Sequence, residues 1–150
     1  KRIIILSSAP QIRFPDCYGI DMSKMGDFVA FQALVQLLQE SGQEKLLEDA
    51  YQRCKQSEHL PVEMVKNEVR ELYDLFDYCA VSQKIAEIVT KVDIIPTVDV
   101  IFQTLDGLHQ ACPDNAGDWY FSGYYPTPGG NRVVNRAFMN YVEKLDERAY

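Results

Sequence analysis

A short, continuous apolar run near the start of the chain, Ile3 to Leu6, most constrains the fold. A strand with one face in water alternates apolar and polar residues, whereas a continuous run is typical of a strand covered on both faces in a parallel sheet. Such a strand needs neighbours in its sheet. A second apolar run, Val98 to Phe102, follows Pro96 and is predicted to be another strand. The sequence therefore predicts an α/β protein.

Between these two runs, apolar residues recur at helical spacing in four stretches. Ser23 is predicted to cap the first helix, Gly42 to end it, and Pro61 to open the third. The expected buried stripes are Phe28, Phe31, Leu34, Val35 and Leu38; Leu46, Leu47, Ala50, Tyr51 and Cys54; Val62, Val65, Val69, Leu72, Tyr73 and Phe76; and Val81, Ile85, Ile88 and Val89. Short connections imply antiparallel packing, so residues 24–90 are predicted to form a small helical bundle.

After the second strand the α/β pattern returns. Thr104 is predicted to cap a short helix, Trp119 to Phe121 to form an aromatic strand, and Asn131 to cap a last helix. The residues expected to point inward from that helix are Val134, Phe138, Tyr141 and Leu145. The chain as a whole is therefore expected to be helix-rich.

Composition restricts the possible partners. With 47% hydrophobic residues among 150, the chain can bury a core. Its net charge is −7, with 22 acidic against 15 basic residues, which leaves no excess of cations for a phosphate backbone. No apolar run is long enough for a bilayer, and the opening residues lack the pattern of a signal peptide. We therefore expect neither nucleic acid nor a membrane as a partner.

The cysteines indicate the compartment. Cys17, Cys54, Cys79 and Cys112 lie far apart and form no C-x-x-C pair, which favours free thiols over disulfides or a zinc site. A cytoplasmic location is expected. The chain also begins directly with a strand and without an initiator Met, so we interpret it as a piece of a longer protein.

The most informative segment for function is the loop that follows the first strand. It holds Arg13, Tyr18, Gly19 and Asp21, and in open α/β sheets ligands bind at the carboxyl ends of the strands. A guanidinium and a phenol there suit a phosphorylated ligand. The alternative is a proline-rich connection in which Phe14 and Tyr18 pack against the next helix.

No catalytic residue is predicted anywhere in this chain. His59 precedes a proline and His109 lies on a short helix without a Cys or Ser in a suggestive position, so both are interpreted as surface or packing residues. Gly129-Gly130 lacks the preceding strand and following Lys of a phosphate-binding loop and is interpreted as a turn. The acidic residues, including Asp93 and Asp99, do not suggest a metal site.

Three segments in the same order resemble glutamine phosphoribosylpyrophosphate amidotransferases, the first enzymes of de novo purine synthesis. Ser8–Met22, SAPQIRFPDCYGIDM, is similar to the segment after that family's phosphoribosylpyrophosphate-binding loop. Val98–Leu108, VDVIFQTLDGL, resembles a late strand and short helix, and Phe121–Pro126, FSGYYP, resembles the family's F-T-G-x-Y-P element. The resemblance covers roughly residues 2–27 and 94–126, and it implies that the bundle at 24–90 is a helical insertion.

The resemblance implies the fold and the reaction of the parent. The chain would be the edge of a type I phosphoribosyltransferase-like parallel-sheet domain and its tail, occupying residues 1–150. The parent would convert glutamine, phosphoribosylpyrophosphate and water to 5-phosphoribosylamine with Mg²⁺. The family's nucleophilic cysteine and acidic substrate loop are not among these residues, so this chain alone is expected to be inactive.

The resemblance also bears on cofactors and partners. Some members of the family bind a 4Fe-4S cluster through late cysteines, but Asp16, Gly117 and Tyr120 occupy those positions here, so no cluster and no other cofactor is expected in this chain. The implied partners are the rest of the parent enzyme, further copies in a homo-oligomer, and purine nucleotides. Within the loop, Arg13 is the expected phosphate contact, with Tyr18 and Gly19 beside it.

Two other functions remain open from the sequence. One is a non-enzymatic regulatory or interaction module, in which the bundle binds a partner and the α/β part is a nucleotide-binding-like scaffold. The other is a free-standing nucleotide-binding domain.

Overall fold

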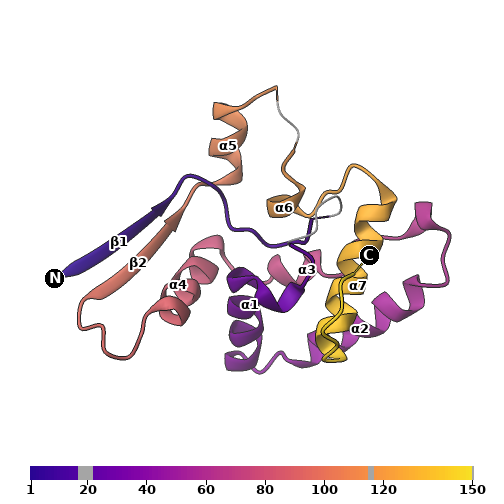
Figure 1. Ribbon diagram of the computed structural model, residues 1–150, viewed down its shortest axis with the longest axis horizontal. Helices are drawn as coiled ribbons and strands as arrows, with labels where there is room; N and C mark the ends of the chain where they lie inside the picture. The colour runs from indigo at the N-terminus through magenta and orange to yellow at the C-terminus, as the bar shows by residue number, and fades with distance from the viewer. Residues whose placement is uncertain (17–21, 115–116, 150) are drawn as a thin grey trace.

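The computed structural model describes residues 1–16, 22–114 and 117–149. In chain order the elements are β1 (Arg2–Ser7), the 3-10 turn η1 (Met25–Asp27), α1 (Val29–Glu40), α2 (Lys45–Ser57), the 3-10 turn η2 (Val62–Met64), α3 (Arg70–Tyr73), α4 (Tyr78–Val89), β2 (Thr97–Phe102), α5 (Leu105–Ala111), α6 (Trp119–Ser122) and α7 (Pro128–Val142). The described chain is rich in helix and contains a small parallel sheet, as predicted. Figure 1 shows the two strands projecting from the helical body, with the amino terminus at their free end.

The sheet consists of β1 and β2, paired in parallel from Arg2 beside Thr97 to Ser7 beside Phe102. The parallel pairing was predicted, but the prediction that the first strand is covered on both faces is wrong for this chain. Every residue from Arg2 to Leu6 is exposed. The reason is that α4 packs against β2, while β2 is the one extensive neighbour of β1 within the described part of the chain.

The two faces of the sheet have different surroundings because side chains alternate along a strand. On one face, Phe102 packs against a small buried cluster supplied by α1 and α4. On the opposite face, Ile4, Leu6 and Ile101 are 51%, 74% and 49% exposed. The second face is therefore open, and its exposed apolar side chains lie beside the ion pair of Arg2 with Asp99 on the same face.

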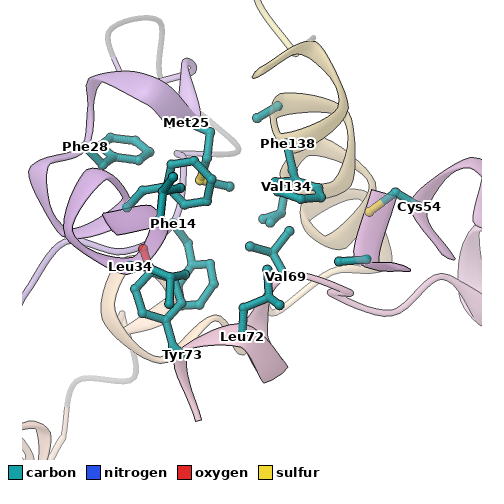
Figure 2. Close-up of a cluster of buried hydrophobic side chains, with 14 of the residues drawn as sticks. Phe14, Met25, Phe28, Leu34, Cys54, Val69, Leu72, Tyr73, Val134 and Phe138 are labelled. Atoms are coloured by element: carbon teal, nitrogen blue, oxygen red, sulfur yellow. The ribbon is translucent and has the colours of Figure 1, made fainter. Parts of the chain in front are cut away.

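The helical body closes around one main hydrophobic core (Figure 2). Phe31 of α1 and Phe138 of α7 are both 0% exposed, and their rings meet edge to face with centroids 6.1 Å apart. The buried members of the core are Phe14, Met25, Phe28, Phe31, Leu34, Val35, Leu38, Ala50, Cys54, Val69, Leu72, Tyr73, Val134, Ala137, Phe138 and Met139. The core thus takes residues from outside the 24–90 range as well as from within it, because α7 packs against α2.

Several local predictions are confirmed. Gly42 follows the end of α1 with φ at +69°, and the amide of Gln43 donates to the carbonyl of Leu38 at 2.8 Å, as in a helix that ends at a left-handed glycine. The Thr104 hydroxyl accepts from the amide of Gly107 and caps α5. The second and fourth predicted helices correspond to α2 and α4.

The third predicted helix is wrong, because the chain makes two short elements, η2 and α3, in place of one long helix. Val65 is extended after η2. The side chain of Asn67 then accepts hydrogen bonds from the amides of Val69 and Arg70 and restarts the helix at α3. Local capping by an asparagine interrupts an apolar pattern that otherwise suits a continuous helix.

The predicted aromatic strand is wrong as well, because Trp119 to Ser122 form the single turn α6. The Asp118 carbonyl accepts from the amides of Phe121 and Ser122, and Gly123 ends the turn with φ at +74°. A glycine in the left-handed region favours a helix end over a continuing strand.

Two predicted caps and three residues predicted to be buried also differ, since Val89 of α4 and Tyr141 of α7 are 46% and 38% exposed. Ser23 is buried and α1 begins later, after Phe28, whose backbone forms the cap. The last helix begins at Pro128, so Asn131 lies inside it and donates from its side chain to the Val65 carbonyl. Leu145 lies beyond the end of α7 and is 41% exposed.

Candidate functional site

The candidate site lies where the chain leaves β1 and β2. Because parallel strands end at the same edge of a sheet, the segments after Ser7 and after Phe102 lie side by side. The amide of Gln103 donates to the Ser7 carbonyl at 3.2 Å and continues the pairing beyond the strands. The loop from Ser8 and the start of α5 therefore share one edge.

Gln11 is the buried polar centre of this edge, with 1% of its surface exposed. Its side-chain amide donates to the Tyr78 carbonyl at 3.0 Å and to the Ser82 hydroxyl at 2.7 Å, both on α4. Its side-chain oxygen accepts two hydrogen bonds from the Arg13 guanidinium, at 3.0 and 2.8 Å. Every polar group of the Gln11 side chain is thus paired, as burial requires.

Tyr78, the first residue of α4, joins the two strand ends. Its hydroxyl accepts from the backbone amide of Gln11 at 3.0 Å and donates to the backbone carbonyl of Gln103 at 2.8 Å. One hydroxyl therefore bonds the segment after β1 and the segment after β2. Burial raises the pKa of the Tyr78 phenol, which keeps the donating proton in place.

Arg13 lies between two phenol rings. Its guanidinium carbon is 4.8 Å from the centroid of Tyr73 and 5.0 Å from that of Tyr78, both within the range of a cation–π contact. Burial lowers the pKa of the guanidinium. Among the residues that the structure describes, no carboxylate lies within salt-bridge distance of it. The predicted phosphate contact is therefore a cation held by aromatic and amide groups, and among the described residues its nearest acidic influence, Asp74, lies beyond salt-bridge distance.

The backbone of the same loop is fixed to α6. The amides of Arg13 and Phe14 both donate to the Tyr120 carbonyl, at 2.8 and 3.0 Å. The Phe14 ring is 1% exposed and meets Tyr73 edge to face, with centroids 5.3 Å apart. The packing of Phe14 that the sequence left open as an alternative is thus present, together with the enclosed Arg13. Tyr18, Gly19 and Asp21 lie outside the described residues.

Sequence reasoning missed Gln11, Tyr73, Tyr78 and Gln103 as parts of this site. Tyr73 was assigned to a buried stripe, which is correct, but its hydroxyl also donates to the Arg13 carbonyl at 3.2 Å. Tyr78 lies just before the fourth predicted stripe, and no local pattern relates it to a loop 67 residues earlier. The sequence carries no signal for Gln103, because its contribution is a backbone carbonyl, which any residue supplies.

The other candidates form no comparable cluster. His109 lies 3.0 Å from Asp118 in an exposed pair, and Gly129-Gly130 lie in the first turn of α7. The Cys54 thiol is buried, which raises its pKa to about 12 and keeps it protonated at neutral pH. Within the described residues, no three His, Cys, Asp or Glu side chains are placed to hold a metal ion.

Comparisons of this chain with protein-family models, with curated proteins and with solved structures find no match. In residues 1–16, 22–114 and 117–149, no helix combines the length and the apolarity needed to cross a bilayer.

Proposed function

We propose that this chain is the carboxy-terminal part of the phosphoribosyltransferase domain of an amidophosphoribosyltransferase, the enzyme that makes 5-phosphoribosylamine from glutamine, phosphoribosylpyrophosphate and water. The three collinear segments that resemble this family support the proposal. Ser8–Met22 begins at the shared carboxyl edge of the sheet, and Val98–Leu108 runs along β2 and passes the same edge after Phe102.

The observation that carries the proposal is the incomplete sheet. Parallel sheets occur almost always with both faces covered by helices and with more than two strands. Here β1 has no buried residue, and the face with Ile4, Leu6 and Ile101 is open. An exposed apolar edge strand is prone to pair with other chains, so natural proteins cover such strands with further strands, helices or loops. The proposed parent supplies them from its preceding residues.

The helical body supports the same conclusion by contrast. The apolar stripes of α1 and α7 are buried against each other and against α2, whereas α5, like β1, contains no buried residue. If the bundle were the binding surface of an interaction module, its apolar stripes would be expected to face outward. The open apolar surface instead belongs to the α/β part.

In the proposed enzyme, this chain contributes one edge of the substrate site. Arg13, the cation without a carboxylate partner among the described residues, is the proposed contact for a phosphate. Within the described residues no three His, Cys, Asp or Glu side chains are placed to hold Mg²⁺, which in the proposed enzyme would be held at the acidic loop outside this chain. Ammonia production and the ribose contacts belong to residues outside this chain.

The proposal predicts activity for the natural gene product that contains this chain and none for the 150-residue chain. With glutamine and phosphoribosylpyrophosphate, the gene product should release pyrophosphate and glutamate together, because the two half-reactions are coupled. The family's nucleophilic cysteine and acidic substrate loop are absent from the short chain, so neither product should appear. A coupled pyrophosphate assay measures the first product. Activity in the short chain, or a gene product inactive with these substrates, contradicts the proposal.

A second prediction concerns Leu6, which is 74% exposed in the chain alone. Leu6→Ala should change the free energy of unfolding of the 150-residue chain by no more than about 0.5 kcal/mol, as for a surface residue. In the natural gene product the same change should cost about 2 to 5 kcal/mol, since the completed sheet buries the side chain. Urea denaturation of both proteins measures the difference.

Leu75 provides the matched control, because it is 48% exposed on the helical body. Leu75→Ala should have a small effect in both proteins. An equal, small effect of Leu6→Ala in both would show that the sheet stays open, and the proposed function would lose its main support.

A further inference from the structure

We propose that Tyr78 is a positioning residue, whose hydroxyl holds the segment Ser8–Phe14 in the conformation that binds the phosphorylated substrate. This inference rests on the proposed function. The helical stretch that contains α4 has no counterpart in the family resemblance. The inference gives α4 an effect on substrate affinity, which it exerts through the segment Ser8–Phe14.

The geometry behind the inference is a double hydrogen bond at one atom. The Tyr78 hydroxyl accepts from the Gln11 amide at 3.0 Å and donates to the Gln103 carbonyl at 2.8 Å. A hydroxyl accepts and donates at once, which neither an amide nitrogen nor an ammonium group does. The same oxygen therefore satisfies a donor from the first loop and an acceptor from the second.

Further contacts connect Tyr78 to the Arg13 guanidinium. The backbone amide of Gln11 is bonded to Tyr78, and the side-chain oxygen of Gln11 accepts from the Arg13 guanidinium at 2.8 and 3.0 Å. The Tyr78 ring also packs against the guanidinium, 5.0 Å from its centroid. The position of the proposed phosphate contact thus depends on the Tyr78 side chain through two routes, one through the hydroxyl and one through the ring. The Tyr78 backbone carbonyl, which accepts from the Gln11 side chain at 3.0 Å, adds a third contact that a side-chain substitution leaves in place.

The two routes can be separated by substitution. Tyr78→Phe keeps the ring and its contact with Arg13 but removes both hydrogen bonds of the hydroxyl, which leaves the Gln11 amide and the Gln103 carbonyl without this partner. The competent loop conformation then becomes one of several. Because apparent affinity falls in proportion to the competent fraction, the effect should appear in substrate binding.

The kinetic arm of the test uses the natural gene product. Tyr78→Phe should raise KM for phosphoribosylpyrophosphate by about 5-fold or more, the factor for one lost hydrogen bond, with kcat changed by less than about 2-fold. Tyr51→Phe is the matched control, since its hydroxyl donates to a Glu143 carboxylate oxygen at 2.6 Å, away from the two loops. That variant should keep KM unchanged.

The structural arm uses the 150-residue chain and does not depend on the reaction. Hydrogen exchange of the Gln11 backbone amide should become at least about 5-fold faster in Tyr78→Phe and stay unchanged in Tyr51→Phe. Both variants should unfold at similar midpoint temperatures, so that the difference in exchange is local. Unchanged Gln11 exchange overturns the inference. Unchanged KM in an active gene product also overturns it and leaves the proposed function intact. A wild-type gene product without activity rejects the proposed function, and the substrate role of Tyr78 with it, whatever the exchange result.

Discussion

Phe138→Ala is expected to lower the free energy of unfolding of the chain by about 3 to 5 kcal/mol, the cost of truncating a fully buried phenylalanine. Phe138 is 0% exposed and lies where α7 meets α1 (Figure 2). Removing its ring leaves a cavity beside Phe31 and deletes their edge-to-face contact. Urea denaturation followed by circular dichroism measures the change.

Tyr124→Ala is the control for an aromatic residue removed at the surface. Tyr124 is 64% exposed, and its ring contacts the Arg70 guanidinium at 4.1 Å. Its loss should cost no more than about 1 kcal/mol, the value of an exposed cation–π contact. If the two variants had similar unfolding free energies, α7 would not be part of the core, and the packing of the helical body described above would be wrong.

Gly123→Ala is expected to destabilise the chain by about 2 to 5 kcal/mol, because two costs combine at this position. Gly123 has φ at +74°, a conformation that L side chains rarely adopt. A Cβ there would also lie 2.8 Å from two carbons of the Phe14 ring, which is buried, and 2.8 Å from the side-chain nitrogen of Asn67. The ring must move for the methyl group to fit.

Gly42→Ala isolates the first cost from the second. Gly42 has a similar φ of +69°, but a Cβ there meets nothing within 4 Å. This variant should lose only about 1 to 2 kcal/mol from backbone strain. The difference between the two variants in urea denaturation measures the packing cost at Phe14. Equal losses would mean that the loop after β1 is not packed under Gly123.

The helical body is closed and the sheet is open, so substitutions in these two parts of the chain are expected to behave differently. Substitutions in the core, such as that of Phe138, act within this chain because its partners are all present. Substitutions on the sheet, such as that of Leu6, act fully only when the open face is covered. Under the proposed function, comparing the chain with the longer gene product separates the two kinds of residue.

Features that depend on neighbouring residues in the sequence were predictable from it. The continuous apolar run at Ile3 predicted a parallel strand, and the glycine at position 42 and the threonine at 104 predicted a helix end and a cap. Each depends on a few adjacent residues, whose backbone preferences and side-chain periodicity act locally. The same local reasoning failed where a distant contact prevailed, as at Asn131, whose side chain bonds the Val65 carbonyl and does not cap a helix.

The site itself required the tertiary structure. Arg13 was recognisable from the sequence as a cation in a loop after a strand, but its enclosure by Tyr73 and Tyr78 was not, because these phenols lie about sixty residues further along the chain. The sequence likewise predicted an apolar strand without indicating how much of it this chain can cover. Burial is a property of the whole assembly of elements, and a run of four apolar residues has the same pattern whether its faces are covered by this chain or by another part of the protein. The sequence therefore determined the two strands, the second and fourth helices and the local signals at Gly42 and Thr104. The tertiary structure decided where the third helix breaks, which elements this chain can bury and which residues meet at the carboxyl edge of its sheet.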